Sequence, residues 1–295
     1  MIHSLNLRDQ SASDISYKVS NFPDGQSDIT INLSHEITED SEVEIVSYFR
    51  NFKDLEIFVC ATAALRRLGI SKVSLNIPYL LGARSDREFV AGGTSYLVDI
   101  IAPILNAKNY KKVYCIDPHS DVAAACIHNL VAHDSHRLVE QAIQTIAPRT
   151  PLTIISPDGG SLKKIYKIVE KISGPLATYP VLVCSKSRGT DGKLSKTEVP
   201  VTDLTVKEYL IIDDICDGGR TFITLANELR RKHGEGDSQI RIHLVVTHGI
   251  FSNGFSQILE VIDTIHFSDS YSKFDPSQHF ELMSGPVFQY PYTSL

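Results

Sequence analysis

Carboxylates, glycines and a cation are concentrated in one stretch of the sequence, residues 209–221. A run of four apolar or aromatic residues leads into the polar set Asp213, Asp214, Asp217, Gly218, Gly219, Arg220 and Thr221. The glycines allow backbone N–H groups to turn inward, and N–H groups at the start of a helix bind anions. Because carboxylates repel a bare phosphate, they suit sugar hydroxyls or a hydrated Mg²⁺. The set predicts a site for a phosphorylated sugar with a metal; the alternative is a solvated acidic turn.

The flanking residues predict where this polar set lies. The run 209–212 is short and apolar, as in a parallel strand buried on both faces. After Thr221, apolar residues recur every three or four positions as far as Leu229, which predicts a helix. The set therefore follows the carboxyl end of a strand, which is the edge where open α/β sheets bind ligands.

The composition limits the classes of protein to which the chain can belong. With 295 residues, 42% of them hydrophobic, it can bury the core of one large or two medium α/β domains. A formal net charge of −6 gives no basic surface for nucleic acid. No apolar run approaches the ~20 residues that span a membrane, and the first residues show no signal-peptide pattern. Most of the five scattered cysteines lie inside apolar runs and none forms a close CxxC pair, which predicts small core residues in a cytoplasmic protein.

A proline-containing break at residues 147–151 predicts a domain boundary. We expect an N-terminal domain at 1–148 and a C-terminal domain at 149–295. Hydrophobic periodicity predicts helices at 50–70, 96–105 and 163–172, and strands at 73–79, 113–116, 152–155 and 242–246.

Residues 209–221 resemble the loop that binds 5-phosphoribosyl 1-diphosphate (PRPP) in type I phosphoribosyltransferases and in PRPP synthetases. A second segment favours the synthetases, because simple phosphoribosyltransferases lack it. Pro78-Tyr79 and the loop after it resemble the synthetase signature Pro-Tyr-x-x-x-Ala-Arg-Gln-Asp-Arg, whose basic residues contact ATP phosphates. Arg84, Asp86 and Arg87 match this signature, and Ser85 replaces its glutamine.

Two further segments of the first half carry the resemblance. Phe22-Pro23-Asp24-Gly25-Gln26 is similar to a Phe-x-Asp/Asn-Gly-Glu hairpin that reaches the ATP site of a neighbouring subunit. Asp117-Pro118-His119-Ser120 is similar to Asp-Leu-His-Ser/Ala, whose histidine approaches Mg²⁺ and the ATP phosphates. The resemblance implies a homo-oligomer, a dimer or a hexamer. It also implies ATP contacts from Phe22, Asp24, Gln26, Arg84, Asp86, Arg87 and His119.

The second half continues the match. Ser156-Pro157-Asp158-Gly159-Gly160 resembles Ser-Pro-Asp-x-Gly-Gly, which implies that Asp158, with His119, holds Mg²⁺. Lys186 and Arg188 retain two cations of a synthetase Lys-Arg-Arg segment that opens a mobile loop, here with Gly189 and Gly192. The resemblance makes Lys186, Arg188 and His119 the catalytic residues. It also includes Thr247 to Ser252 and fades beyond about Asp263, in a polar and aromatic tail.

The chain is thus similar to a divergent PRPP synthetase. The resemblance implies an α/β fold of two type I phosphoribosyltransferase-like domains, each with a mainly parallel sheet flanked by helices. The implied reaction is Mg²⁺-dependent transfer of the β,γ-diphosphate of ATP to the anomeric hydroxyl of ribose 5-phosphate, which releases AMP. Asp213, Asp214 and Asp217 would hold the ribose, and residues 218–221 would hold its 5-phosphate.

Departures from the synthetase pattern leave other functions open. Synthetases usually have Asp-Thr-Ala-Gly-Thr at 217–221, so this chain loses a hydroxyl and gains Arg220, and its glycine pair would leave room for a bulkier acceptor. ADP-ribose is such an acceptor, and its use would place the enzyme in NAD salvage. A phosphoribosyltransferase is a second alternative, which the segments around Arg84 and His119 disfavour. A non-catalytic regulatory subunit is a third, which the retention of Asp158, Lys186 and Arg188 disfavours.

Overall fold

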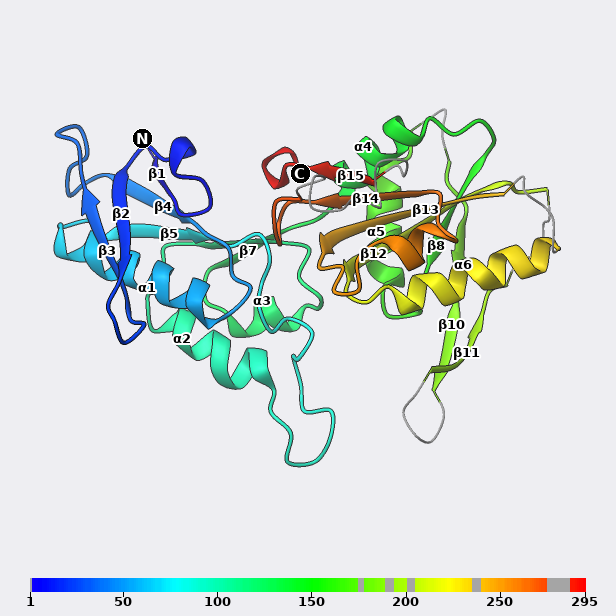
Figure 1. Cartoon of the computed structure of the whole chain (residues 1–295), viewed down its shortest axis with the longest axis horizontal. Coiled ribbons are helices and arrows are strands. Elements are labelled where there is room, and N and C mark those ends of the chain that lie inside the picture. The colour runs from blue at the N-terminus through cyan, green and yellow to red at the C-terminus, as the bar shows by residue number, and fades with distance from the viewer. Residues whose placement is uncertain (1, 175–177, 189–193, 201–204, 235–239, 275–286) are drawn as a thin grey trace. The chain divides into compact units, whose positions relative to one another are not determined.

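The computed structural model describes residues 2–174, 178–188, 194–200, 205–234, 240–274 and 287–295 (Figure 1). The chain divides into two compact units, Met1–His133 and Asp134–Leu295. The division lies earlier than the predicted boundary at residue 148. The reason is α4, His136–Ile146, whose buried residues Leu138, Val139 and Ala142 pack with the core of the second unit.

The first unit is built on a parallel sheet with the strand order β1-β4-β5-β6-β7. Its strands are Ile2–Asn6, Glu42–Val46, Lys72–Asn76, Val113–Ile116 and Leu130–His133. Strands β2, Ser16–Asn21, and β3, Ser27–Asn32, form a separate antiparallel hairpin. The helices are α1, Phe52–Arg67, α2, Ala102–Asn106, and α3, Val122–Cys126. The predicted helix at 96–105 begins as a π-helical turn, Leu97–Ile101, which continues into α2.

Helix α1 runs beside this sheet (Figure 1), and local signals fix both of its ends. The side chain of Asn51 accepts hydrogen bonds from the N–H groups of Lys53 and Asp54, as an N-cap does. At the other end, Gly69 has a φ of 89°, in the left-handed region that a helix commonly enters where it stops. The apolar face between these ends packs against the sheet residues, so α1 is held in a defined position for the segments at its N-terminus.

The second unit has a six-stranded parallel sheet with the order β15-β14-β13-β12-β8-β9. Its strands are β8, Leu152–Ser156, β9, Val181–Val183, β12, Glu208–Cys216, β13, Arg241–Gly249, β14, Thr264–Ser268, and β15, Val287–Tyr290. A hairpin of β10, Ser185–Arg188, and β11, Leu194–Glu198, lies outside the sheet. With α4, the helices are α5, Leu162–Ile172, α6, Arg220–His233, and α7, Ser256–Leu259. From β8 the chain adds β9 on one side and β12 to β15 on the other, so the strand order reverses between β8 and β12.

The aromatic tail supplies the edge strand β15, which the sequence did not predict. Inside the sheet, His266 Nδ1 lies 3.0 Å from the Tyr290 hydroxyl, which lies 2.8 Å from Thr145 Oγ1 on α4. On its other side, His266 Nε2 lies 2.8 Å from Thr264 Oγ1, which also contacts His243 Nδ1 at 2.7 Å. This chain of hydrogen bonds ties β15 to β13, β14 and α4. Phe288 stacks on the His266 ring, with the centroids 4.9 Å apart.

The two buried histidines of this network are expected to make the protein sensitive to acid. Burial, and then the neighbouring His243, lower the pKa of His266 to about 3, and burial lowers the pKa of His243 to about 4. The unfolded chain binds these protons near pH 6.5, so the free energy of unfolding falls as the pH drops from 6.5 towards 3. The slope is at most about 1.4 kcal/mol per pH unit for each group. Urea unfolding measured between pH 7 and pH 4 should show a flatter dependence for His266→Gln than for the wild type, and no change for the exposed control His35→Gln.

Two further predictions from the composition concern the state of the cysteines and the presence of membrane-spanning helices. All five cysteines are free thiols, and Cys115, Cys184 and Cys216 are buried, as predicted. Among the helices of the described ranges, none combines the length and the apolar composition that a bilayer crossing requires.

Candidate active site

The carboxylates predicted to bind a sugar lie where the strand order of the second unit reverses. The last pairing of β8 with β12 joins Ile155 to Ile211, whereas β12 continues to Cys216 beside β13. Asp213 and Asp214 therefore stand just beyond the carboxyl end of β8, whose own loop carries Asp158. A reversal of strand order opens a crevice at the carboxyl edge of a parallel sheet, and such crevices bind ligands.

The backbone after β12 forms the turn that the glycines predicted. Gly219 has a φ of 76° and its carbonyl accepts the N–H groups of Phe222 and Ile223, which begin α6. A Cβ atom on Gly219 would lie 2.4 Å from Ile258 Cδ1, so both the conformation and the packing require glycine. Arg220 is the first residue of α6 and is exposed. The turn and the 14-residue helix behind it suit an anion at this position.

The glycine pair does not open extra space for a bulky acceptor. A Cβ atom on Gly218 would meet Asn253 Nδ2 at 2.8 Å, and the equivalent position on Gly219 is filled by Ile258. The volume that the missing side chains would occupy therefore belongs to other residues of the protein. The expectation that these glycines leave room beside the phosphate is therefore wrong, and the missing hydroxyl and Arg220 remain the differences that could affect the choice of acceptor.

The carboxylates of Asp213 and Asp214 form a crowded, largely buried group. Asp213 Oδ1 accepts a hydrogen bond of 2.9 Å from the N–H of Asp214, which is 5% exposed. Burial, and then the negative charges of Asp214 and Asp158, raise the pKa of Asp213 above its ordinary value. Lys164 Nζ of α5 lies 4.0 Å from Asp214 Oδ2. Carboxylates held together in this way are stabilised by hydroxyl donors or by a cation.

Asp158 has a structural role beside the one predicted for it. Its Oδ1 atom accepts the N–H groups of Gly160 and Ser161, at 3.0 and 3.1 Å, which shapes the turn into α5. Within the described ranges, no group of three histidine, cysteine or acidic side chains forms a ready metal cage. Mg²⁺ commonly takes only one or two protein carboxylates and completes its shell with water and substrate phosphates. The donors Asp158, Asp213 and Asp214 fit a Mg²⁺ that is bound in that way.

The loop after β13 supports the turn, and its role was missed from the sequence. Ser252 Oγ donates a hydrogen bond of 2.6 Å to Asp217 Oδ1, and Asn253 Nδ2 donates to the carbonyl of Gly218 at 3.4 Å. The N–H groups of Ile250 and Phe251 donate to the carbonyl of Cys216. The match at Thr247 to Ser252 was visible in the sequence, but nothing in it indicated contact with Asp217. Lys164 was missed for the same reason, since only the fold brings α5 to β12.

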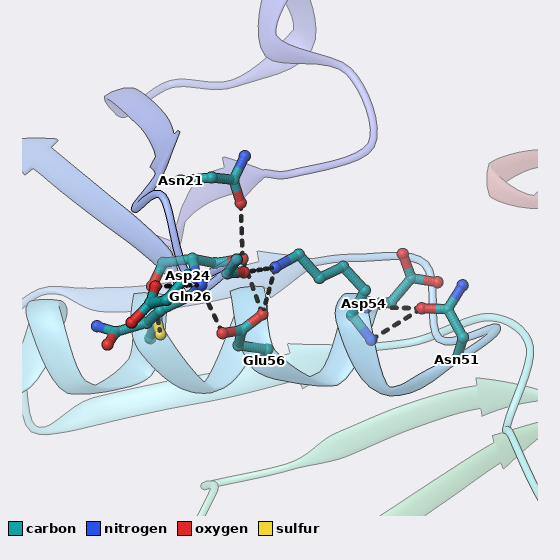
Figure 2. A network of polar contacts seen from close by, with 10 residues as sticks. Asn21, Asp24, Gln26, Asn51, Asp54 and Glu56 are labelled. Carbon is teal, nitrogen blue, oxygen red and sulfur yellow. Dashed lines mark hydrogen bonds and ion pairs between the residues drawn. The ribbon is translucent and has the colours of Figure 1, made fainter.

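In the first unit, the predicted hairpin is present at residues 22–26. The N–H of Phe22 donates to the carbonyl of Gln26 at 2.8 Å, and the N–H of Gln26 donates to Asp24 Oδ1 at 3.1 Å. Gly25 has a φ of 92°, which the tight turn requires. The side chains of Phe22, Asp24 and Gln26 are all exposed. Figure 2 shows Asp24 and Gln26 beside α1.

The structure also brings the two predicted phosphate-binding loops of the first unit together. They follow the adjacent parallel strands β5 and β6. Ser120 Oγ donates a hydrogen bond to Asp86 Oδ2, which joins one loop to the other. Arg84, Arg87 and His119 are exposed on these loops, and Arg87 lies 5.3 Å from the ring centroid of Phe89. Asp86 is thus a link between the loops and a weak partner of Arg87, at 3.9 Å.

Only the backbone of the third predicted group, Lys186 and Arg188, is described by the structure. Lys186 and Arg188 are on β10, but their side chains lie outside the described part, as do Gly189 and Gly192. The backbone places both cations on one arm of a β-hairpin. Their predicted catalytic roles remain predictions.

The fold and the carboxylate-bearing turn at the strand reversal are similar to those of known proteins. The model of the phosphoribosyl transferase domain family matches residues 126–258. A ribose-phosphate pyrophosphokinase of Saccharolobus solfataricus is 28% identical over 230 residues, which are 77% of this chain and 76% of that protein. A ribose-phosphate pyrophosphokinase of Thermosipho africanus is 25% identical over 229 residues, 75% of this chain and 67% of that protein. The crystal structure of phosphoribosylpyrophosphate synthetase from Mycobacterium smegmatis has the same fold, with a TM-score of 0.79, 15% identity and coverage of 98% of this chain and 94% of that chain.

The parallel sheets, the turn at Gly219 and these similarities define an α/β enzyme with two phosphoribosyltransferase-like units. The chain is similar to ribose-phosphate pyrophosphokinases, from which it diverges in sequence.

Proposed function

We propose that the protein transfers the β,γ-diphosphate of ATP to the anomeric hydroxyl of ribose 5-phosphate, which gives PRPP and AMP. The observation that carries this proposal is the combination of Asp213, Asp214 and the Gly219 turn at the strand reversal of the second unit. Relatives that align with about three quarters of this chain are named ribose-phosphate pyrophosphokinases, and this similarity supports the proposal.

Each part of the second unit would act on a different part of the acceptor. The N–H groups at the start of α6, with Arg220 and Thr221, would bind the 5-phosphate. Asp213, Asp214 and Asp217 would accept hydrogen bonds from the ribose hydroxyls and so orient the anomeric oxygen. Ser252 would hold Asp217 in place through its 2.6 Å hydrogen bond. Positioning of this kind is a large part of catalysis in phosphoryl transfer.

The first unit would bind the nucleotide. Arg84, Arg87 and His119 are exposed cationic or donor groups on two linked loops, and such groups stabilise the charge of phosphates. The anomeric oxygen would form a bond to the β-phosphorus as the bond from that phosphorus to the α,β-bridging oxygen breaks. AMP leaves with the bridging oxygen, and the proton of the hydroxyl passes to solvent. Lys186 and Arg188 would balance negative charge on the transferred diphosphate.

A Mg²⁺ ion would complete the site. Asp158 and the phosphates of the substrates would hold it, and the ion would neutralise charge on the transferred group. The oxygen donors of Asp158, Asp213 and Asp214 are of the kind that Mg²⁺ prefers.

A second acceptor, ADP-ribose, is favoured by one observation, the exposed guanidinium of Arg220 at the start of α6. A charge-assisted bond from this group to a diphosphate would contribute roughly 1.5–3 kcal/mol. We expect Arg220→Gly to reduce kcat/KM for ADP-ribose about tenfold to a hundredfold and to affect ribose 5-phosphate less.

The experiment that tests the proposal uses ATP, Mg²⁺ and each acceptor in turn, with product masses as the measurement. AMP and PRPP from ribose 5-phosphate are the expected products. A diphosphorylated ADP-ribose would establish the second acceptor, and its absence would exclude NAD salvage. Absence of AMP with both acceptors would contradict the proposed function. Phosphoribosyl transfer from PRPP to a nucleobase would indicate the phosphoribosyltransferase alternative.

The proposal includes assembly and location. We propose that the protein works in the cytoplasm as at least a homodimer, since the exposed hairpin tip matches one that serves a neighbouring subunit in similar synthetases. Sedimentation together with activity tests the assembly, because a fully active monomer at all concentrations would contradict it.

A further inference from the structure

The hairpin formed by β2 and β3 is fixed to α1 by a group of polar contacts around Glu56 (Figure 2). Both carboxylate oxygens of Glu56 are used. Oε1 accepts the N–H of Ser27 at 2.9 Å, and Oε2 accepts the hydroxyl of Ser27 at 2.8 Å. Ser27 is the residue directly after the predicted ATP-binding tip, and it is 1% exposed. The charged carboxylate of Glu56 therefore accepts two hydrogen bonds from Ser27, the first residue of β3.

A second residue of α1 reinforces the same attachment. Lys53 Nζ lies 2.8 Å from Glu56 Oε2 and donates a hydrogen bond of 2.6 Å to the carbonyl of Gly25 inside the turn. On the opposite strand, Asn21 Oδ1 lies 3.2 Å from Ser27 Oγ. The hydrogen bond from Lys53, and then the N–H and hydroxyl of Ser27, lower the pKa of Glu56 to about 2. The carboxylate is therefore ionised at neutral pH, the state in which it accepts all three donors.

The tip of the hairpin is exposed to solvent, whereas Ser27 at its base is buried. Phe22 is 52% exposed, although an aromatic ring of this size is usually buried or engaged, and Asp24 and Gln26 are exposed beside it. A base held by several hydrogen bonds under an exposed aromatic tip is an arrangement that can hold a binding group in place before the ligand arrives.

We propose that Glu56 is a positioning residue for the nucleotide: it fixes the hairpin so that Phe22, Asp24 and Gln26 are held ready to contact ATP. This inference rests on the proposed function, because it assumes that ATP is the ligand of the tip. Glu56 acts through Ser27 and the turn and does not itself touch the substrate.

The test compares full-length variants for ATP binding, steady-state kinetics and amide hydrogen exchange. Glu56→Ala should raise the KM for ATP about tenfold or more, with kcat and the KM for ribose 5-phosphate changed less than twofold, since binding that is equal in ground and transition states is lost. The amide hydrogens of residues 21, 22 and 24–27 should exchange at least tenfold faster, while those in the middle of α1 stay unchanged. Glu56→Gln retains one acceptor oxygen for Ser27 and loses the charge that pairs with Lys53, so its KM for ATP should fall between those of the wild type and Glu56→Ala. The exposed control Glu36→Gln should match the wild type.

Each outcome decides between the inference and its premise. If Glu56→Ala keeps the wild-type KM for ATP, the positioning role is wrong, whatever its exchange rates. If both KM values and the melting temperature change together, Glu56 serves the fold alone, and Ser27→Ala would show the same pattern. A wild-type protein that binds ATP but makes no PRPP would overturn the proposed reaction and leave the positioning result standing. A wild-type protein that binds no ATP would overturn both.

Discussion

The double variant Asp213→Asn, Asp214→Asn is expected to lose about a hundredfold to ten-thousandfold of kcat/KM for AMP release. Each carboxylate would accept a charge-assisted hydrogen bond of roughly 1.5–3 kcal/mol from a sugar hydroxyl, and the loss of two such bonds gives this range. The folded protein should not be weakened. The raised pKa of Asp213 means that its ionised form is less favourable in the folded protein than in the unfolded chain, so a neutral amide relieves repulsion at neutral pH.

The measurement is AMP production with a parallel thermal melt. A melting temperature equal to or above that of the wild type, with greatly reduced turnover, would indicate a site whose charges serve function at the expense of stability. The control is Glu170→Gln, an exposed carboxylate on α5, which should change neither quantity. Near wild-type AMP release from the double variant would remove Asp213 and Asp214 from the proposed site.

Gly219→Ala is expected to damage the phosphate turn by two separate effects. An alanine at a φ of 76° costs about 1–3 kcal/mol in backbone strain. Its Cβ would also lie 2.4 Å from Ile258 Cδ1, and Ile258 is 2% exposed and so has little room to move. We expect the KM for ribose 5-phosphate to rise at least hundredfold, because the N–H groups at the start of α6 would leave their positions. Steady-state kinetics would measure the rise in KM, and urea unfolding would measure the loss of stability.

A second substitution separates the two effects at Gly219. Combining Gly219→Ala with Ile258→Ala removes the overlap and leaves the backbone strain, so phosphate binding should recover in part. The matched control is Gly174→Ala, because a Cβ on Gly174 would meet nothing within 4 Å and its φ is not in the left-handed region. Wild-type kinetics in Gly219→Ala would show that the turn does not bind the phosphate.

The sequence predicted the parts of this protein that depend on local pattern. Strong hydrophobic periodicity located α1, α5 and α6, and the apolar run before Asp213 correctly indicated the strand β12. The glycine at 219 was predictable because only glycine readily takes a positive φ in such a turn. The short strand β15 was missed because its four residues, Val287–Tyr290, carry no clear alternation and are identified by pairing with β14.

Contacts between distant segments could not be predicted in this way. Lys164 approaches Asp214, and Ser252 reaches Asp217, only because the strand order places their elements side by side. The same holds for α4, which follows the first unit in sequence but packs into the second. The link between Glu56 and Ser27 spans 29 positions, so no local signal marks it. Motif resemblance supplied the candidate residues, and only the three-dimensional arrangement identified what holds them.

The exposed ring of Phe22 has a practical consequence for spectroscopy. The sequence contains no tryptophan, so Phe22→Trp would introduce a single indole at the end of the hairpin. Its emission wavelength would depend on whether that ring faces water or lies against a base, and its anisotropy would report the rigidity of the tip. One conservative substitution would thus convert the hairpin into an optical reporter in which nucleotide binding could be followed without turnover.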